Sequence, residues 1–190
     1  MSAIVERSAD DANAANGCPR CPLLRDALTG WGRLDIAKAL AVATRGVIPP
    51  PDRYETNDDA GTHAAPVPPT GGRLTATIDF WDDPIDVYSI SLAQGEKLFA
   101  RLSDEPAPVS LTLWQPGTLH VTWPGPVDPA ERAAEGAVVG GQERLAFRVP
   151  VGGTYYLEVR AGAGLRAVEN YELSIALGPS VAGQPGGRTA

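Results

Sequence analysis

Apolar and polar residues alternate along most of the chain after residue 72. In the stretch from Asp86 to Leu92, the residues Tyr88, Ile90 and Leu92 fall on one side and those between them on the other. A period of two is typical of a half-buried β-strand and not of a helix. Similar runs, separated by turns rich in Gly, Pro and Asp, cover residues 73–79, 86–92, 97–102, 109–114, 119–123, 144–149, 154–159 and 170–176. The pattern predicts a mainly β fold, an antiparallel jelly-roll-like β-sandwich.

The part of the chain before residue 46 follows a helical period instead. Leu34, Ala37 and Leu40 are spaced as one face of a helix, which the proline run from Pro49 cannot continue. We expect one long loop over 124–141, with a helical turn at 129–135. We predict four segments: a helical segment over 1–46, a Pro-rich linker over 47–71, the β-sandwich over 72–178, and a disordered tail over 179–190.

Charge and hydropathy narrow the range of partners. The formal net charge is −7, and the sequence shows no basic cluster that would neutralise phosphates, so we expect no nucleic-acid partner. No apolar run approaches the ~20 residues of a membrane helix. The N-terminus lacks the basic start and apolar middle of a signal peptide. We therefore expect no membrane span and no signal peptide in this chain.

The two cysteines, Cys18 and Cys21, form a single Cys-Pro-Arg-Cys motif. Such a pair is compatible with half of a zinc site, a redox pair, a local disulfide or two inert thiols. Zinc needs further ligands, and the two histidines, His63 and His120, are far apart in the sequence. A redox pair is expected in a βαβ context, which the pattern does not predict. We therefore favour a disulfide or an inert thiol pair.

Two segments resemble known families. Residues 7–40, in which Gly-Trp-Gly-Arg-Leu-Asp precedes the predicted helix, resemble the last stretch of a subtilisin-like serine protease domain. Residues 54–177 are similar to a bacterial pre-peptidase C-terminal domain. Three motifs carry this second resemblance: Tyr54-Glu-Thr-Asn-Asp-Asp59, with Thr56 where the family usually has Pro; Asp83-Pro-Ile-Asp-Val-Tyr88, which resembles an Asp-x-x-Asp-x-Tyr signature; and Gly153-Thr-Tyr-Tyr-Leu-Glu-Val159, which resembles the penultimate strand.

The order of these two segments matches that of secreted bacterial proteases in which such a sandwich follows the catalytic domain. The resemblance implies a secreted, non-catalytic C-terminal portion of a subtilisin-like endopeptidase, with the protease domain as a partner in cis that is missing here. The sandwich would assist secretion, folding or substrate attachment. A subtilisin-type site needs Asp, His and a Ser in a Gly-Thr-Ser-Met-Ala context, and no such motif occurs. We therefore expect no enzymatic activity from this chain.

Two groups of acidic residues suggest a site for a hard cation. Ca²⁺ prefers six to eight oxygen ligands. The first group comprises Glu55, Asn57, Asp58 and Asp59, and the second comprises Asp82, Asp83 and Asp86. On the residues alone, Asp and Asn that form turns on a solvated rim remain the alternative. The resemblance implies a set of calcium ligands, because the matching motifs supply them in collagen-binding relatives: Glu55, Asn57, Asp58, Asp83 and Asp86.

Aromatic residues give a second binding hypothesis. Several of them cannot all face the core if the strands alternate, and the adjacent Tyr155 and Tyr156 must point to opposite faces. We predict Trp114 and Tyr156 as contact residues for a protein or polysaccharide, and the alternative is that they fill the core. Besides the protease portion, two functions remain open: a stand-alone polysaccharide- or protein-binding module, and a structural appendage without a ligand.

Overall fold

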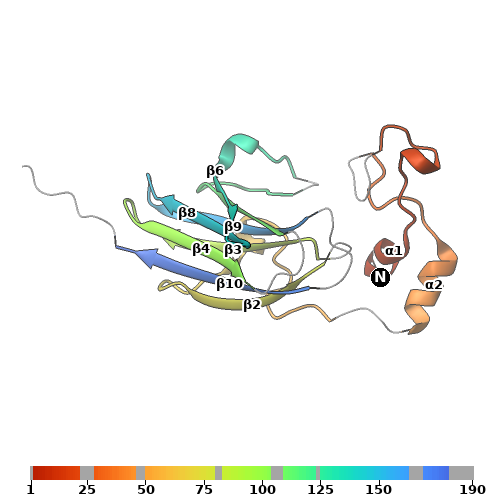
Figure 1. Ribbon diagram of the computed structural model, residues 1–190, viewed down its shortest axis with the longest axis horizontal. Helices are drawn as coiled ribbons and strands as arrows, with labels where there is room; N and C mark the ends of the chain where they lie inside the picture. Colours follow the sequence, from red (N-terminus) through yellow and green to blue (C-terminus); the bar gives the residue numbers. More distant parts are fainter. Residues whose placement is uncertain are drawn as a thin grey trace, which may run out of the picture.

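Two five-stranded sheets pack face to face as a β-sandwich, and a helical segment lies beside one end of it (Figure 1). The computed structural model describes residues 2–21, 28–45, 50–79, 83–103, 109–122, 125–162 and 169–179. The arrangement confirms the predicted mainly β fold. The boundaries of the four predicted segments stay predictions.

The first sheet has the strand order β1-β3-β9-β5-β6. Its strands are β1 (Ala65–Pro66), β3 (Ile85–Leu92), β9 (Gly153–Ala161), β5 (Val109–Trp114) and β6 (Arg132–Glu135). Strand β1 runs parallel to β3, and the other neighbours in this sheet are antiparallel.

The second sheet has the order β2-β10-β4-β8-β7, and its pairings are antiparallel. Its strands are β2 (Gly72–Ile78), β10 (Glu169–Gly178), β4 (Lys97–Ser103), β8 (Gln142–Arg148) and β7 (Ala137–Val139). The strands from β2 to β5 alternate between the two sheets. Their connections therefore cross at the ends of the sandwich, where loops from different parts of the chain meet.

The period of two explains which side chains form the core. In β4, Leu98, Ala100 and Leu102 are buried between the sheets, whereas Lys97 and Phe99 face solvent. Strand β3 is buried on both faces at its start. Its Tyr88 side belongs to the main core, as predicted, and its opposite side belongs to a smaller cluster formed by Ala60, Ile85, Val87, Trp114 and Val121.

Two predicted elements are wrong. Residues 119–122 form a loop and not a strand, because the Asp59 carboxylate accepts a hydrogen bond from the backbone amide of Val121 at 2.7 Å. The predicted helical turn is present as a short 3-10 helix (Pro129–Glu131), but the rest of the predicted loop is not continuous, since β6 and β7 follow. Alanine occupies both half-buried positions of β6, so its apolar period is too weak to recognise in the sequence.

The helical segment contains α1 (Ser2–Ser8) and α2 (Ile36–Arg45), which contact each other. Helix α2 confirms the helix predicted from the Leu34 spacing. Two further 3-10 helices span Ala14–Asn16 and Gly61–His63. No helix among the described residues has the length and apolar composition needed to cross a membrane.

Part of the predicted linker packs against the sandwich. Asn57 and Ala60 are buried, and the amide of Val67 donates to the carbonyl oxygen of Ser89 in β3 at 2.9 Å. Proline content predicted an extended spacer here, but backbone hydrogen bonds to β3 outweigh that tendency. The predicted tail lies outside the described residues except for residue 179.

Candidate functional site

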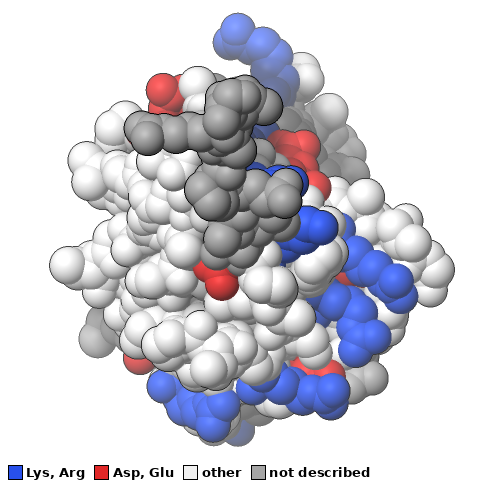
Figure 2. Space-filling model, turned by 90° about the vertical axis from the view of Figure 1, so that its left-hand side faces the viewer, with Lys and Arg blue, Asp and Glu red and all other residues white. Residues whose placement is uncertain are grey.

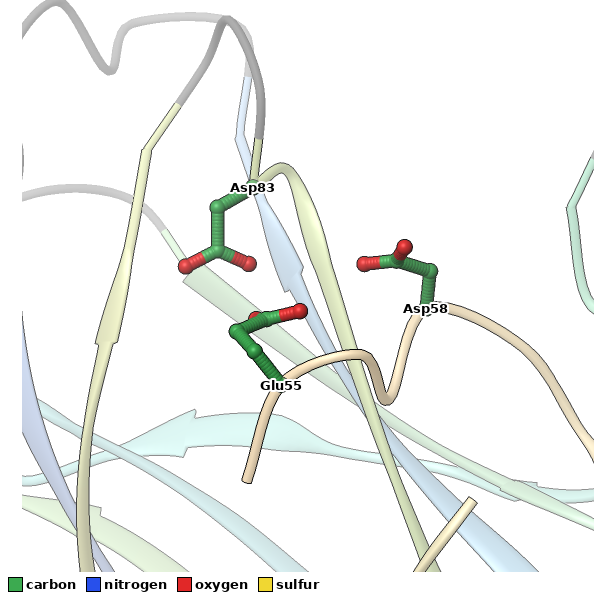
Figure 3. Close-up of side chains that lie close together, drawn as sticks. All are labelled: Glu55, Asp58 and Asp83. Atoms are coloured by element: carbon green, nitrogen blue, oxygen red, sulfur yellow. The ribbon is translucent and has the colours of Figure 1, made fainter. Parts of the chain in front are cut away.

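Two loops meet at the end of the sandwich that lies next to the helical segment. The first, residues 52–59, precedes β1, and the second joins β2 to β3. Their relative position is fixed by the backbone, because the amide of Val87 in β3 donates to the carbonyl oxygen of Asn57 at 2.7 Å. This contact brings Glu55 and Asp58 next to Asp83, just before β3 (Figure 3).

Glu55, Asp58 and Asp83 form the group that we call the acidic cluster. One carboxylate oxygen from each residue lies within 4.8 Å of the corresponding oxygens of the other two. The three carboxylates gather in the space between the two loops (Figure 3), and Glu55 and Asp83 are half-buried. The structure therefore brings together three of the five residues predicted as metal ligands.

The other two predicted ligands, Asn57 and Asp86, are completely buried. The Asn57 side-chain amide donates to Asp86 Oδ1 at 2.8 Å, and the Tyr171 hydroxyl donates to Asp86 Oδ2 at 2.5 Å. The Tyr171 hydroxyl also lies 2.6 Å from that of Tyr88. Asp86 is not part of the group whose carboxylate oxygens lie within 4.8 Å of one another, and its hydrogen bond positions Asn57.

Burial and like charge raise the pKa values of these carboxyl groups. Desolvation, with repulsion from Asp86 and Glu55, raises the pKa of Asp83 to about 11. Desolvation and the charge of Asp58 raise the pKa of Glu55, and desolvation raises the pKa of Asp58. Desolvation likewise raises the pKa of Asp86 well above its ordinary value. Carboxylates in this environment need either protons or a cation to become stable.

The residues at this site fit a hard cation. Of the buried side-chain oxygens of the described residues that have no hydrogen-bond partner, three belong to this site: Glu55 Oε1, Asn57 Oδ1 and Asp83 Oδ1. A buried polar atom without a partner costs about 1–3 kcal/mol. The donor set consists of carboxylate and amide oxygens, which Ca²⁺ prefers over nitrogen and sulfur. A cation would therefore remove the repulsion and satisfy the unpaired oxygens at the same time.

Sequence analysis missed three residues that support the site. Asp52 ties the first loop to β2, because its carboxylate accepts hydrogen bonds from the amides of Tyr54 at 2.7 Å and Thr77 at 2.9 Å. Asp79, at the end of β2, is buried and pairs with Arg7 of α1. Tyr171 belongs to the last strand. An Asp at the start of a turn is a signal that could have identified Asp52, whereas no local signal marks Tyr171.

Asp59, of the first predicted group, does not enter the cluster. Asp59 contacts another loop, since its carboxylate lies 2.8 Å from His120 Nδ1 and binds the amide of Val121. Asp82 lies outside the described residues. Asp59 therefore stabilises the 118–122 loop and leaves Asp58 as the member of this pair that faces the cluster.

The prediction that Trp114 forms an exposed contact surface is wrong. Its side chain is 1% exposed, and its indole N–H donates to Glu158 Oε2 at 2.7 Å. The ring lies beneath the Arg132 guanidinium and lines a cavity of about 500 Å³. Tyr156 is half-buried and packs against the same cluster, whereas Tyr155 faces the main core. The opposite orientation of these two tyrosines is confirmed.

Cys18 and Cys21 are joined by a disulfide. A disulfide is one of the two alternatives favoured from the sequence, the other being a pair of inert thiols. The bond closes a turn in which the amide of Cys21 donates to the carbonyl oxygen of Cys18 at 3.0 Å. The disulfide therefore belongs to the helical segment and does not contribute to the acidic cluster.

The fold and the site define a β-sandwich protein with a partly buried carboxylate cluster at one end. Solved structures with a related shape include the pre-peptidase C-terminal domain of a collagenase from Bacillus anthracis, at 19% identity and a TM-score of 0.48. The similarity covers 62% of this chain and 99% of that one.

Two other solved structures share features of the same shape. Aeromonas hydrophila PliG, a periplasmic inhibitor of g-type lysozyme, has 13% identity and a TM-score of 0.44, covering 60% of this chain and 96% of that one. CorA, a surface-associated copper-binding protein of Methylomicrobium album BG8, has 10% identity and a TM-score of 0.43, covering 60% and 98%. No family model and no curated protein matches the sequence. At this level, the structural similarities do not indicate a shared function.

Proposed function

We propose that this chain is a calcium-stabilised, non-catalytic β-sandwich module and the C-terminal portion of a secreted subtilisin-like serine protease. Its role is to assist secretion, folding or attachment of the protease to its substrate. One observation carries the calcium part of the proposal: the acidic cluster holds three carboxylates beside buried oxygens that have no partner among the described residues.

Glu55, Asp58 and Asp83 would hold the cation, and Asn57 Oδ1 is available as a further neutral ligand. Bound calcium supplies positive charge that cancels the repulsion between the carboxylates. Asp86 keeps the Asn57 side chain in place through the hydrogen bond to its amide group. Because the ligands come from two loops, binding would fasten the segment before β1 to the start of β3.

The protease part of the proposal is supported by the resemblance of residues 7–40 and by the surface of α2. Ile36 and Leu40 are 74% and 64% exposed, and the neighbouring Leu34 is 60% exposed. An apolar helical face of this kind suits a packed protein interface better than contact with water. A reading frame immediately upstream that encodes the Asp, His and Gly-Thr-Ser-Met motifs would support this parent. An upstream frame of another enzyme class would contradict it.

The calcium proposal is tested by thermal unfolding of the full chain with calcium, with magnesium and with a chelator. At a calcium concentration of a hundred times Kd, binding to the folded state alone adds about 2.7 kcal/mol. For a domain of this size, we expect the melting temperature to rise on the order of 10 °C. Magnesium should have a much smaller effect, because it demands octahedral geometry and dehydrates reluctantly.

Two variants make this test specific. Asp83→Asn removes a cluster charge and should abolish the calcium response. Asp128→Asn changes an exposed carboxylate outside the cluster, where Asn also caps the 3-10 helix as Asp128 does now, and should keep the full response. If the wild type melts at the same temperature with calcium and with chelator, the carboxylates only form turns and the calcium proposal is wrong.

A further inference from the structure

A second charged feature lies on the outer face of the sheet formed by β2, β10, β4 and β8. Outward-facing positions of these strands carry one carboxylate, Glu172, and five cations, Arg73, Lys97, Arg101, Arg144 and Arg148. We call the five cations the basic face. Lys and Arg side chains gather along one side of the molecule in Figure 2. This local excess of positive charge stands out in a chain whose net charge is −7.

Strand pairing places cations of the basic face directly opposite one another. Lys97 pairs with Arg148, and Arg101 pairs with Arg144, across β4 and β8. Ser174 of β10 lies between Arg101 on one side and Arg73 on the other. Like charges at opposite positions of antiparallel strands destabilise a sheet. The arrangement therefore has a cost that a bound anion would offset.

Most of these cations have no acidic partner in the described part of the chain. Arg73 forms an ion pair with Glu172 at 2.9 Å, and Arg144 donates to the neutral amide oxygen of Gln142 at 2.9 Å. Lys97, Arg101, Arg144 and Arg148 form no ion pair with any described residue. Their charged groups are therefore available to a partner with acidic groups.

Phe99 lies between the two cation pairs and is 48% exposed. It is two residues from both Lys97 and Arg101 along β4, about 6.6 Å at ~3.3 Å per residue. Its cross-strand neighbours are Ala146 and Ala176, whose small side chains leave the ring open to a ligand. Among the outward-facing positions of these four strands, it is the one aromatic residue. An apolar ring thus stands between two groups of cations on a flat surface.

We propose that the basic face binds an acidic polysaccharide, a chain of sugars that carry carboxylate or sulfate groups. The apolar face of one sugar ring would pack on Phe99, and acidic groups on neighbouring sugars would meet the cation pairs on either side. Four of the five cations are arginines, whose planar guanidinium binds an oxyanion through two parallel hydrogen bonds. The inference rests on the attachment role in the proposed function and names the class of substrate.

Two other polyanions match the basic face less well. Single-stranded nucleic acid stacks successive bases on several aromatic side chains, and this face offers one ring. An anionic membrane favours apolar side chains gathered at one tip, but the exposed valines beside this face lie at opposite ends of β8. Val139 pairs with Gln142, the first residue of β8, whereas Val151 follows Arg148, the last residue of β8.

The test measures binding of the full chain to chondroitin sulfate by calorimetry in chelator, at low and high salt, with dextran as the neutral control. We expect binding that weakens as salt rises and no binding to dextran. The double variant Arg101→Ala/Arg144→Ala should weaken binding roughly tenfold or more, since it removes two charge-assisted contacts at once. Phe99→Ala should weaken it several-fold.

The matched control is Arg20→Ala/Arg45→Ala, which removes the same charge from exposed positions of the helical segment and should leave binding unchanged. The proposal is overturned by absent binding, by equal losses in the two double variants, or by tighter binding to anionic vesicles or oligo-dT than to chondroitin sulfate. Near-native melting temperatures of the variants exclude misfolding as the cause. Because this assay contains no calcium, its failure leaves the calcium response untouched, and loss of the calcium response leaves this assay valid.

Discussion

The acidic cluster and the basic face both gather like charges, but they differ in burial. Glu55 and Asp83 of the acidic cluster are half-buried beside fully buried Asn57 and Asp86, so water screens their repulsion less than it does on an open surface. The cations of the basic face project into solvent; the Arg73 side chain, for example, is 65% exposed. Salt screens charges there within about 8 Å at physiological ionic strength.

This difference decides how strongly each region depends on a bound counter-charge. Like charges in a desolvated loop destabilise the fold itself, so a cation at the acidic cluster should change stability. Like charges on an exposed sheet destabilise it only slightly, by a few tenths to 1 kcal/mol per pair. An anion on the basic face should therefore change binding behaviour more than the melting temperature. The following predictions separate the two regions on this basis.

A large effect is expected from Tyr171→Phe. The substitution removes the hydroxyl that donates to Asp86 Oδ2 and leaves a buried carboxylate oxygen without a donor, at a cost of about 1–3 kcal/mol. Urea unfolding measures the loss. Tyr155→Phe is the matched control, because its hydroxyl donates to the carbonyl oxygen of the exposed residue Val151, which water can satisfy.

The same comparison extends to the basic face. Arg101→Ala should change the free energy of unfolding by no more than about 0.5 kcal/mol, as for surface substitutions in general. A loss in Arg101→Ala as large as that in Tyr171→Phe would show that burial does not distinguish the two regions.

A second effect is expected from pH in the absence of calcium. The folded-state pKa of Asp83 is raised to about 11, whereas an unfolded Asp titrates near pH 3.9. Between these values the folded state binds more protons than the unfolded state. Stability is therefore highest at low pH and falls as pH rises through this window. We expect the melting temperature in chelator to fall between pH 5 and pH 8.

Two variants sharpen the pH prediction. Asp83→Asn removes the titrating group and should flatten the profile, whereas Arg148→Ala on the basic face should keep the slope of the wild type. A melting temperature in chelator that rises from pH 5 to pH 8 would contradict the raised pKa values at the acidic cluster.

The sequence was sufficient to predict the sandwich because the alternation in strands such as β3 and β4 is strong. The resemblance to a pre-peptidase C-terminal domain also implied Glu55, Asp58 and Asp83, whose carboxylates the structure brings together. It was not sufficient to separate these three from Asp86, since the hydrogen bond from Tyr171 depends on a strand 85 residues away along the chain. Long-range pairing of this kind leaves no local pattern.

The basic face was missed for a related reason. Its cations occupy outward-facing positions in three strands, β2, β4 and β8, that are distant in sequence, so no stretch of the chain looks basic. Only the register, which sets Lys97 against Arg148 and Arg101 against Arg144, gathers them on one surface. For Trp114, the sequence predicted a binding residue where the structure has a buried one. A tryptophan at the end of a strand seemed available for binding, but the Glu158 carboxylate satisfies its N–H inside the protein.

The central claim is that calcium replaces protons at the acidic cluster, and titration calorimetry at pH 7 tests it most directly. Calcium is titrated into wild type and Asp83→Asn in two buffers with different ionisation enthalpies, so that the difference in heat gives the number of protons released. We predict one calcium ion per wild-type chain with proton release, because the carboxyl pKa values are raised, and loss of binding in Asp83→Asn. Absence of binding to the wild type, or binding without proton release that Asp83→Asn leaves unchanged, would contradict the claim.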